Sequence, residues 1–426
     1  MNKNFLALGL AAALLAPQVA GAEGFAINEW SAEGVAMGGA RMFAEDDAAN
    51  VAYNPASITK VKGEVMKSSY TYLSPHGNYK LYDSNNDEIK GEPTHNKVHA
   101  GWAVGSYYVR QINDKEWFGI GAFPRFAMVS EFERASKAST NAFFSKLNGV
   151  SVTPTYAHKF DKKWSAAVGA EINYVGLELQ KNLVIPTAGV NGTTQIEGES
   201  YALGWNAAAN YAFDDKNEIG VVYRSRIKHS LEADLKGYGT KSPASPLVGS
   251  NDVFGNAYGV VTLPDSWDIG YNHKFDKKTR LELKATRTNW STYDALNVYF
   301  DKSLVGIPGI AESSPSAKNW SNSWRYAIGL EHNFSDKYAA MAGFAFDESS
   351  IPHDGGDFMV PTGLRRTYSI GARYNDKKQT VAVALGWMDV GTLDFAGHPE
   401  KGDAYSSAHA YDSFTKIASI SYQRKF

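Results

Sequence analysis

The chain has 426 residues, of which 21% are charged, with a net charge of -2 and no cysteine. The near-neutral charge argues against a nucleic acid as partner, and the lack of cysteine excludes disulfides, thiol chemistry and thiolate metal sites. The 24 Tyr, 21 Phe and 10 Trp are residue types that gather where a protein crosses the faces of a membrane.

The first residues have the pattern of a secretory signal peptide. Lys3 precedes an apolar run from Phe5 to Leu15, and Ala20-Gly21-Ala22 is a small-residue cleavage pattern. The run has about half of the roughly 20 apolar residues that a membrane helix needs. We therefore expect residues 1–22 to be removed before Glu23.

Residues 23–62 show no sustained alternation of polar and apolar residues. They are rich in Ala and Gly, and Ser31 and Asp46 or Asp47 are candidate helix caps. A wide barrel without a plug is an open pore, so we expect this segment to form a compact helical hatch inside the wall that follows it.

Residues 63–426 contain six short turns of one kind, each combining acidic and basic residues. They are Asn113-Asp114-Lys115-Glu116, Phe160-Asp161-Lys162-Lys163, Phe213-Asp214-Asp215-Lys216-Asn217, Phe275-Asp276-Lys277-Lys278, Phe334-Ser335-Asp336-Lys337 and Asn375-Asp376-Lys377-Lys378. Asn and Asp tolerate tight turns, and an aromatic before a charged turn is typical of a strand that leaves a bilayer. Six turns join twelve strands, and one further strand at each end gives 14. The sequence predicts an all-β fold, a 14-stranded antiparallel transmembrane β-barrel with both termini in the periplasm.

The strands between the turns alternate with period two. One face of a strand carries Trp164, Ala166, Val168, Ala170, Ile172 and Tyr174, and the last residues, Ala418 to Phe426, alternate in the same way. A soluble sandwich would show the same alternation. Aromatics that bracket the apolar rows, together with the signal peptide, favour lipid over a protein core as the surroundings of these rows. We expect a monomer in the bacterial outer membrane, in contact with its lipid and lipopolysaccharide.

The N-terminal stretch and the strands carry motifs of a known family. Those of the N-terminal stretch are Gly24-Phe25, Asn28-Glu29, Ser31, Gly34, Gly38-Gly39-Ala40, Asp46-Asp47-Ala48 and Asn54-Pro55-Ala56. Together they resemble the hatch of the FadL family of outer-membrane transporters. Tyr223-Arg224-Ser225, Leu263-Pro264, Ile269-Gly270, Trp290-Ser291 and Tyr368-Ser369-Ile370-Gly371 resemble the family's strand motifs in the same order. Glu23 and the bulky Trp30 depart from the family pattern.

The resemblance implies uptake of long-chain fatty acids or, in one branch, of aromatic hydrocarbons. It implies extracellular capture, binding inside the barrel, movement of the hatch and release into the membrane through a window in the third strand. Phe25 resembles the hatch aromatic that reaches into the binding pocket, and Asn28, Asn54, Pro55 and Ala56 belong to the hatch motifs.

The third strand contains residues that disfavour regular pairing. Pro124 lacks an amide N–H, and Gly119 and Gly121 have no side chain to pack, so we expect a break in pairing there. An ordinary strand end that passes into a loop is the alternative. The position in the third strand, which matches the family's kinked strand, favours the window.

Two groups of residues are candidates for ligand binding. If Ile219, Val221, Tyr223, Ile227 and Leu231 face outward, then Arg224, Arg226 and Lys228 face the lumen, where they favour a carboxylate ligand or pair with the barrel's own acids. Phe132, Phe143, Phe144 and Leu147 are apolar candidates for extracellular capture, or they pack among the loops themselves.

No motif for other chemistry stands out. The histidines lack metal-ligand spacing and no phosphate-binding loop occurs in a strand context, so we expect no metal, no cofactor and no enzyme. An outer-membrane barrel enzyme and a general diffusion porin are the alternatives, and neither gives the hatch a role.

Overall fold

The computed structural model describes residues 24–91, 94–185, 190–239, 253–301, 313–399 and 402–426. The expected signal peptide, residues 1–22, lies outside this part of the chain. One antiparallel sheet of 19 segments closes on itself, because β1 (Glu64–Tyr82) pairs with both β2 (Gly101–Gln111) and β19 (Ser407–Lys425).

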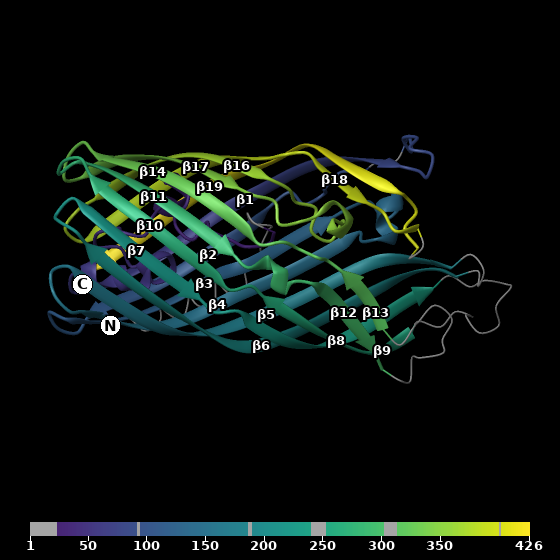
Figure 1. The fold of residues 1–426 in the computed structure, drawn as a ribbon, viewed down its shortest axis with the longest axis horizontal. Coiled ribbons are helices and arrows are strands. Elements are labelled where there is room, and N and C mark those ends of the chain that lie inside the picture. Colours follow the sequence, from purple (N-terminus) through teal and green to yellow (C-terminus); the bar gives the residue numbers. More distant parts are fainter. Residues whose placement is uncertain (1–23, 92–93, 186–189, 240–252, 302–312, 400–401) are drawn as a thin grey trace.

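The remaining segments follow one another around the wall (Figure 1). They are β3 (Glu116–Glu131), β4 (Phe144–Lys159), β5 (Trp164–Ile185), β6 (Val190–Ala212), β7 (Asn217–Arg224), β8 (Ile227–Gly239), β9 (Val253–Leu263), β10 (Ser266–Lys274), β11 (Thr279–Thr288), β12 (Ala295–Phe300), β13 (Ser313–Ala317), β14 (Ser323–Asn333), β15 (Tyr338–Asp347), β16 (Arg365–Asn375), β17 (Gln379–Val390) and β18 (Leu393–Ala396). Five barrel strands consist of two segments each: β7 with β8, β9 with β10, β11 with β12, β13 with β14, and β17 with β18. The wall is thus a closed barrel of 14 antiparallel strands, which confirms the predicted fold class.

Helical elements are short. The described residues contain α2 (Ala32–Ala36), α3 (Asn50–Tyr53) and the 3-10 turns η1 (Pro55–Lys60), η2 (Lys137–Thr140), η4 (Trp290–Thr292) and η5 (His353–Gly355). In this part of the chain, no helix has the length and apolar character needed to cross a membrane.

The six predicted turns share one mechanism. The side chains of Asp161, Asp214, Asp276 and Asp376 each accept hydrogen bonds from the backbone N–H groups two and three residues later. Ser335 does the same, and Asn113 accepts from the N–H of Lys115. The N–H groups of Trp164 and Lys163 favour the carboxylate anion, so the pKa of Asp161 lies below its ordinary value. The chain ends beside these turns, where the Phe426 N–H donates to the Glu64 carbonyl at 2.9 Å (Figure 1).

The two faces of the wall have opposite polarity. Trp164, Val168 and Ile172 of β5 are about half exposed on the outer face, whereas Ser165 and Asn173 of the same strand are buried. This is the alternation of a barrel whose outer surface lies in lipid.

Four neighbouring strands are interrupted at one height, which we call the crease. It consists of residues 225–226, 264–265, 289–294 and 318–322. Backbone hydrogen bonds join neighbouring interruptions: Asn289 N–H donates to Asp265 O at 3.0 Å, and Lys318 N–H donates to Asp294 O at 2.7 Å. On the side of the short turns, inward residues such as Asp268 and Glu282 are polar. Beyond the crease most inward residues of β8, β9 and β12 are apolar, such as Leu231, Val261 and Leu296, and buried His229 is an exception. The crease therefore separates a polar from an apolar half of the interior.

Residues 24–62, here called the N-terminal segment, are almost entirely buried against the inner face. Inward glycines allow its close approach: a Cβ added at Gly119 of β3 would lie 2.8 Å from Val51 Cγ2. On the opposite side, Gly38 has φ +61° and lies against the backbone of Phe344 in β15. The wall strands thus leave room for the backbone of this segment.

Candidate functional site

The apolar half of the interior contains one cluster of buried side chains, here called the interior apolar cluster. It includes Phe25, Phe126, Met128, Leu147, Val175, Ile227, Leu231, Leu235, Ala257, Val261, Leu263, Trp290, Tyr293, Leu296, Val298, Trp320, Ile351 and Val360. Buried apolar and aromatic side chains are those that contact hydrophobic ligands in proteins.

Phe25 lies at the centre of an aromatic group within this cluster. Its ring centroid is 4.7 Å from Trp290, 5.4 Å from Tyr293, 5.7 Å from Trp320 and 6.0 Å from Phe126. The side chain is 1% exposed, so the start of the N-terminal segment is packed rather than loose. Phe25 thus lies among the rings of the interior apolar cluster.

Strand β3 changes its pairing partner along its length. It pairs with β4 as far as Glu131, but its pairing with β2 ends at Ser106–Ala122. Beyond this point the N-terminal segment takes the place of β2: Ile27 N–H donates to Arg125 O at 2.8 Å, and Ala127 N–H donates to Phe25 O at 2.9 Å. A register shift between Pro124 and Phe126 accompanies the change. The wall ladder is therefore open between β2 and β3.

The opening begins later in β3 than the sequence predicted. Pro124 lies at it, but Gly119 and Gly121 pair regularly with Val109 and Tyr107 of β2 and with β4, so they do not form the break. Both glycines face inward, and a Cβ at either would meet the side chain of Val51. Their lack of a side chain makes room for the N-terminal segment.

Trp30 closes the inner side of the opening. Its Nε1–H donates to Pro124 O at 2.5 Å, and its ring centroid lies 5.3 Å from Phe123 of β3. Its carbonyl accepts the Tyr107 hydroxyl of β2 at 2.9 Å. One residue of the N-terminal segment thus bridges both edges of the opening, so the segment and the opening cannot move independently.

The Asn54-Pro55-Ala56 motif connects the N-terminal segment to β6. The Asn54 amide donates to Asn210 Oδ1 at 2.7 Å, and its Oδ1 accepts from Ala56 N–H at 3.1 Å and caps η1, which begins at Pro55. Asn28 lies at the other end of the segment, where its carbonyl accepts the Tyr53 hydroxyl at 3.2 Å. These buried hydrogen bonds hold the two ends of the N-terminal segment in place.

We expect Asn54→Ala to reduce uptake several-fold without preventing barrel assembly. The substitution removes a buried hydrogen bond and leaves Asn210 with an unsatisfied acceptor, at a cost of about 1–3 kcal/mol. Uptake by cells with equal surface expression, together with heat-modifiable gel mobility, tests this. Asn210→Ala removes the same bond from the wall and should match it, whereas normal uptake in both variants would show that the motif only shapes the segment.

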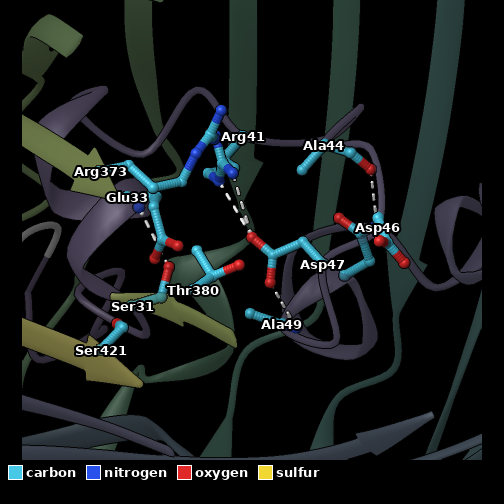
Figure 2. Close-up of polar contacts among 12 residues, drawn as sticks. Ser31, Glu33, Arg41, Ala44, Asp46, Asp47, Ala49, Arg373, Thr380 and Ser421 are labelled. Atoms are coloured by element: carbon cyan, nitrogen blue, oxygen red, sulfur yellow. Dashed lines mark hydrogen bonds and ion pairs between the residues drawn. The ribbon is translucent and has the colours of Figure 1, made fainter. Parts of the chain in front are cut away.

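A charge network joins the N-terminal segment to the polar half of the wall (Figure 2). Arg41 pairs with Asp47 at 3.1 Å and with Glu331 at 3.0 Å, and Glu331 also pairs with Arg280 and Arg373. Each of these side chains is less than one fifth exposed. Breaking such a pair leaves an uncompensated buried charge, so the network resists displacement of this part of the segment.

The prediction that Arg224, Arg226 and Lys228 face the lumen is wrong for Arg226 and Lys228. Arg224 is buried, and it pairs with Asp268 at 2.6 Å. Arg226 is 60% exposed beside Asp265, and Lys228 is also exposed. The crease explains the error: Ser225 and Arg226 interrupt the ladder between β7 and β8, and the alternation shifts by one residue. Ile227 and Leu231 consequently face inward.

The four apolar loop candidates lie in different places. Phe132 is buried among Tyr79 and Phe358, and Phe143 is buried beneath the Arg134 guanidinium. Phe144 begins β4 and is partly exposed, and Leu147 of β4 belongs to the interior apolar cluster. Phe132 thus packs among the loops at the end opposite the short turns, and of the four residues only Leu147 belongs to the interior apolar cluster.

Sequence reasoning missed the residues that the crease contributes. Trp290 and Tyr293 come from η4 and the residue that follows it, and Lys318 and Trp320 come from the interruption between β13 and β14. Lys318 is 1% exposed, pairs with Asp357 and lies 3.8 Å from Met359 Sδ at the edge of the cluster. The sequence offered one signal for these residues: Trp290, Lys318 and Trp320 stand outside any alternating run.

Comparison with known proteins gives a consistent result. A family described as "Outer membrane protein transport protein (OMPP1/FadL/TodX)" matches residues 13–423. The chain is 23% identical over 421 residues to the long-chain fatty acid transport protein of Escherichia coli K12, covering 90% of this chain and 91% of the relative. It is 24% identical over 466 residues to a putative outer membrane protein of Neisseria meningitidis, covering 100% and 99%.

Solved structures share the fold. A Pseudomonas aeruginosa FadL homologue superposes with a TM-score of 0.83 at 18% identity, covering 95% of this chain and 100% of the other. The P. putida toluene transporter TodX has a TM-score of 0.70 at 16% identity, covering 94% and 99%. The family's members are transporters and channels, so an enzyme is not supported. The chain belongs to the OMPP1/FadL/TodX family of outer membrane transport proteins.

Proposed function

We propose that the protein takes up long-chain fatty acids by extracellular capture, binding in the interior apolar cluster and release into the membrane between β2 and β3. The change of pairing partner in β3 carries this proposal, because it opens the wall ladder next to that cluster. The N-terminal segment closes the opening through Trp30 and reaches the cluster through Phe25. A ligand that displaces Phe25 would strain the hydrogen bonds to β3 and so favour opening.

The polar groups at the cluster support a ligand with an anionic head. Lys318 is a buried cation there, and in the described part of the structure the indole N–H groups of Trp290 and Trp320 have no acceptor. A carboxylate can accept hydrogen bonds from an ammonium group and from an indole N–H, whereas a hydrocarbon accepts none. The carboxylate would compete with Asp357 for Lys318.

We expect Lys318→Met to raise the Kd for a long-chain fatty acid about tenfold or more, because a hydrogen bond to a charged group contributes roughly 1.5–3 kcal/mol. The Kd for the alcohol of equal chain length should not change. Calorimetry or fluorescent-ligand displacement on purified protein measures both. Asp357→Asn should lower the Kd for the acid. Arg226→Gln, on the outer face, should change neither the Kd for the acid nor that for the alcohol. An equal loss of affinity for acid and alcohol in Lys318→Met would argue for a collapsed pocket.

An aromatic hydrocarbon is the second candidate. The rings around Phe25, which include Trp290, Tyr293 and Trp320, would suit a small aromatic ligand. If Lys318→Met leaves the Kd for the fatty acid unchanged while toluene stabilises the protein against unfolding, an aromatic hydrocarbon replaces the fatty acid as the proposed ligand.

The proposal includes a monomer with both termini in the periplasm and lipopolysaccharide around the extracellular end. Short turns on the side of the C terminus, and a sheet that closes on itself through the pairing of β1 with β19, support this arrangement. A general porin would conduct ions steadily in planar bilayers. We expect a closed channel, because the N-terminal segment packs against the inner face of the wall.

A further inference from the structure

The barrel closes where β1 meets β19, here called the seam. These are the first and last strands, so no turn joins them and no turn length sets their register. A slip by two residues would preserve the alternation of inward and outward side chains. The polarity pattern alone therefore does not select the native register.

Residues 46–48 of the N-terminal segment bind both sides of the seam at once. Lys67 of β1 and Gln423 of β19 are register partners with side chains pointing inward. Lys67 Nζ lies 2.9 Å from Asp47 Oδ1 and 2.7 Å from Glu33 Oε2. Gln423 Nε2 donates to Asp46 O at 2.8 Å, and its Oε1 accepts from Ala48 N–H at 3.0 Å.

Further contacts extend this binding along β19. Ser421 Oγ accepts from Ala32 N–H at 2.8 Å and lies 2.8 Å from Ser69 Oγ across the seam. Lys425 Nζ lies 2.5 Å from Asp46 Oδ2. A slip by two residues would shift β19 by about 7 Å along β1. Residues 46–48 could not then reach both Lys67 and Gln423.

We propose that the N-terminal segment selects the register in which the barrel closes: it binds β1 and β19 through Lys67 and Gln423, and these contacts can form only when the seam is paired in the native register. This role belongs to assembly and is independent of transport. The segment must then be in place before the last strand pairs.

A cysteine pair at the seam reports the register, because the natural chain has no cysteine. Thr71 and Ser419 are partners whose hydroxyl oxygens lie 2.7 Å apart, and no described hydrogen bond joins them to the N-terminal segment. Thr71→Cys with Ser419→Cys should form a disulfide only in the native register, whereas Ser69→Cys with Ser419→Cys should form one only after a slip by two. Full-length protein is refolded from urea into detergent or lipid, and each disulfide is followed over time.

With Lys67→Met and Gln423→Ala added, we expect the native-register disulfide to form about tenfold more slowly and the slipped disulfide to appear. Gln423→Ala alone should give a smaller effect of the same kind. Lys60→Met is the matched control, because it removes the 2.7 Å ion pair with Glu218 of β7, away from the seam. It should leave both disulfides unchanged.

A rescue separates register choice from general misfolding. Oxidising the Thr71→Cys, Ser419→Cys pair at the start of refolding should restore the yield of the Lys67→Met, Gln423→Ala barrel. The covalent link would then hold β1 and β19 in the native register in place of the contacts of Lys67 and Gln423. Failure of this rescue would overturn the proposal. So would unchanged disulfide kinetics in the doubly substituted chain, or an equal slowing by Lys60→Met.

Discussion

A disulfide between residues 26 and 126 should abolish uptake, and a reducing agent should restore it. Ala26 and Phe126 face each other as bridge partners between the N-terminal segment and β3. They form a non-hydrogen-bonded antiparallel pair, in which Cα atoms lie about 4.5 Å apart, within reach of a disulfide. Ala26→Cys with Phe126→Cys would hold residues 25–27 on β3 and keep Trp30 across the opening.

The measurement is uptake of labelled fatty acid by cells or proteoliposomes, before and after reduction. We expect a fall to the level of cells that lack the protein, while ligand still binds the oxidised protein in detergent. The single cysteine variants control for loss of the Phe126 ring. Full uptake in the oxidised state would show that the ligand leaves by another route, most simply past the N-terminal segment into the periplasm.

Arg125→Met should destabilise the barrel by about 3–5 kcal/mol, the usual cost of leaving one member of a buried ion pair without its partner. Arg125 follows Pro124 in β3, and its Nη1 lies 2.8 Å from Glu171 Oε2 of β5, with both side chains at most 4% exposed. Glu171 also accepts the Ser151 hydroxyl at 2.5 Å. Without the guanidinium, the Glu171 carboxylate is left buried without its charge partner.

Equilibrium unfolding by urea in lipid measures the change. The double variant Arg125→Met, Glu171→Met should recover most of the stability, because well-packed apolar residues often replace a buried ion pair at little cost. Arg226→Gln removes a guanidinium that is 60% exposed, although its partner Asp265 is buried, and should cost less than Arg125→Met. A double variant as unstable as the single one would mean that packing around Arg125, rather than its charge, is responsible.

The sequence predicted those parts of the structure that depend on local rules. The six turns could be found because an Asp, Asn or Ser side chain near the start of each turn accepts hydrogen bonds from the N–H groups that follow, whatever the rest of the chain does. Six turns determine 14 strands, and the N-terminal segment was recognisable because it does not alternate. The placement of Phe25 came from the family resemblance.

The errors arose where one strand depends on another. A two-residue interruption at Ser225 and Arg226 reverses the facing of every later residue in that strand, and no local rule signals it. The break in β3 lies beyond Gly119 and Gly121 because the N-terminal segment, distant in sequence, provides a new hydrogen-bonding partner at Arg125. Trp290 and Trp320 belong to no alternating run, so the period-two template could not assign them to the interior.

The crease has a consequence for how such a transporter changes its specificity. Trp290, Tyr293, Lys318 and Trp320 all stand on short insertions between strand segments rather than in the paired ladder. On the proposed function, a substitution in one of these insertions alters the surface that the ligand would contact without breaking a hydrogen bond of the strand ladder or reversing the lipid-facing side. Relatives with different cargo would then share the wall and differ at the crease, so exchanging residues 289–294 and 318–322 between them is a compact way to transfer substrate preference.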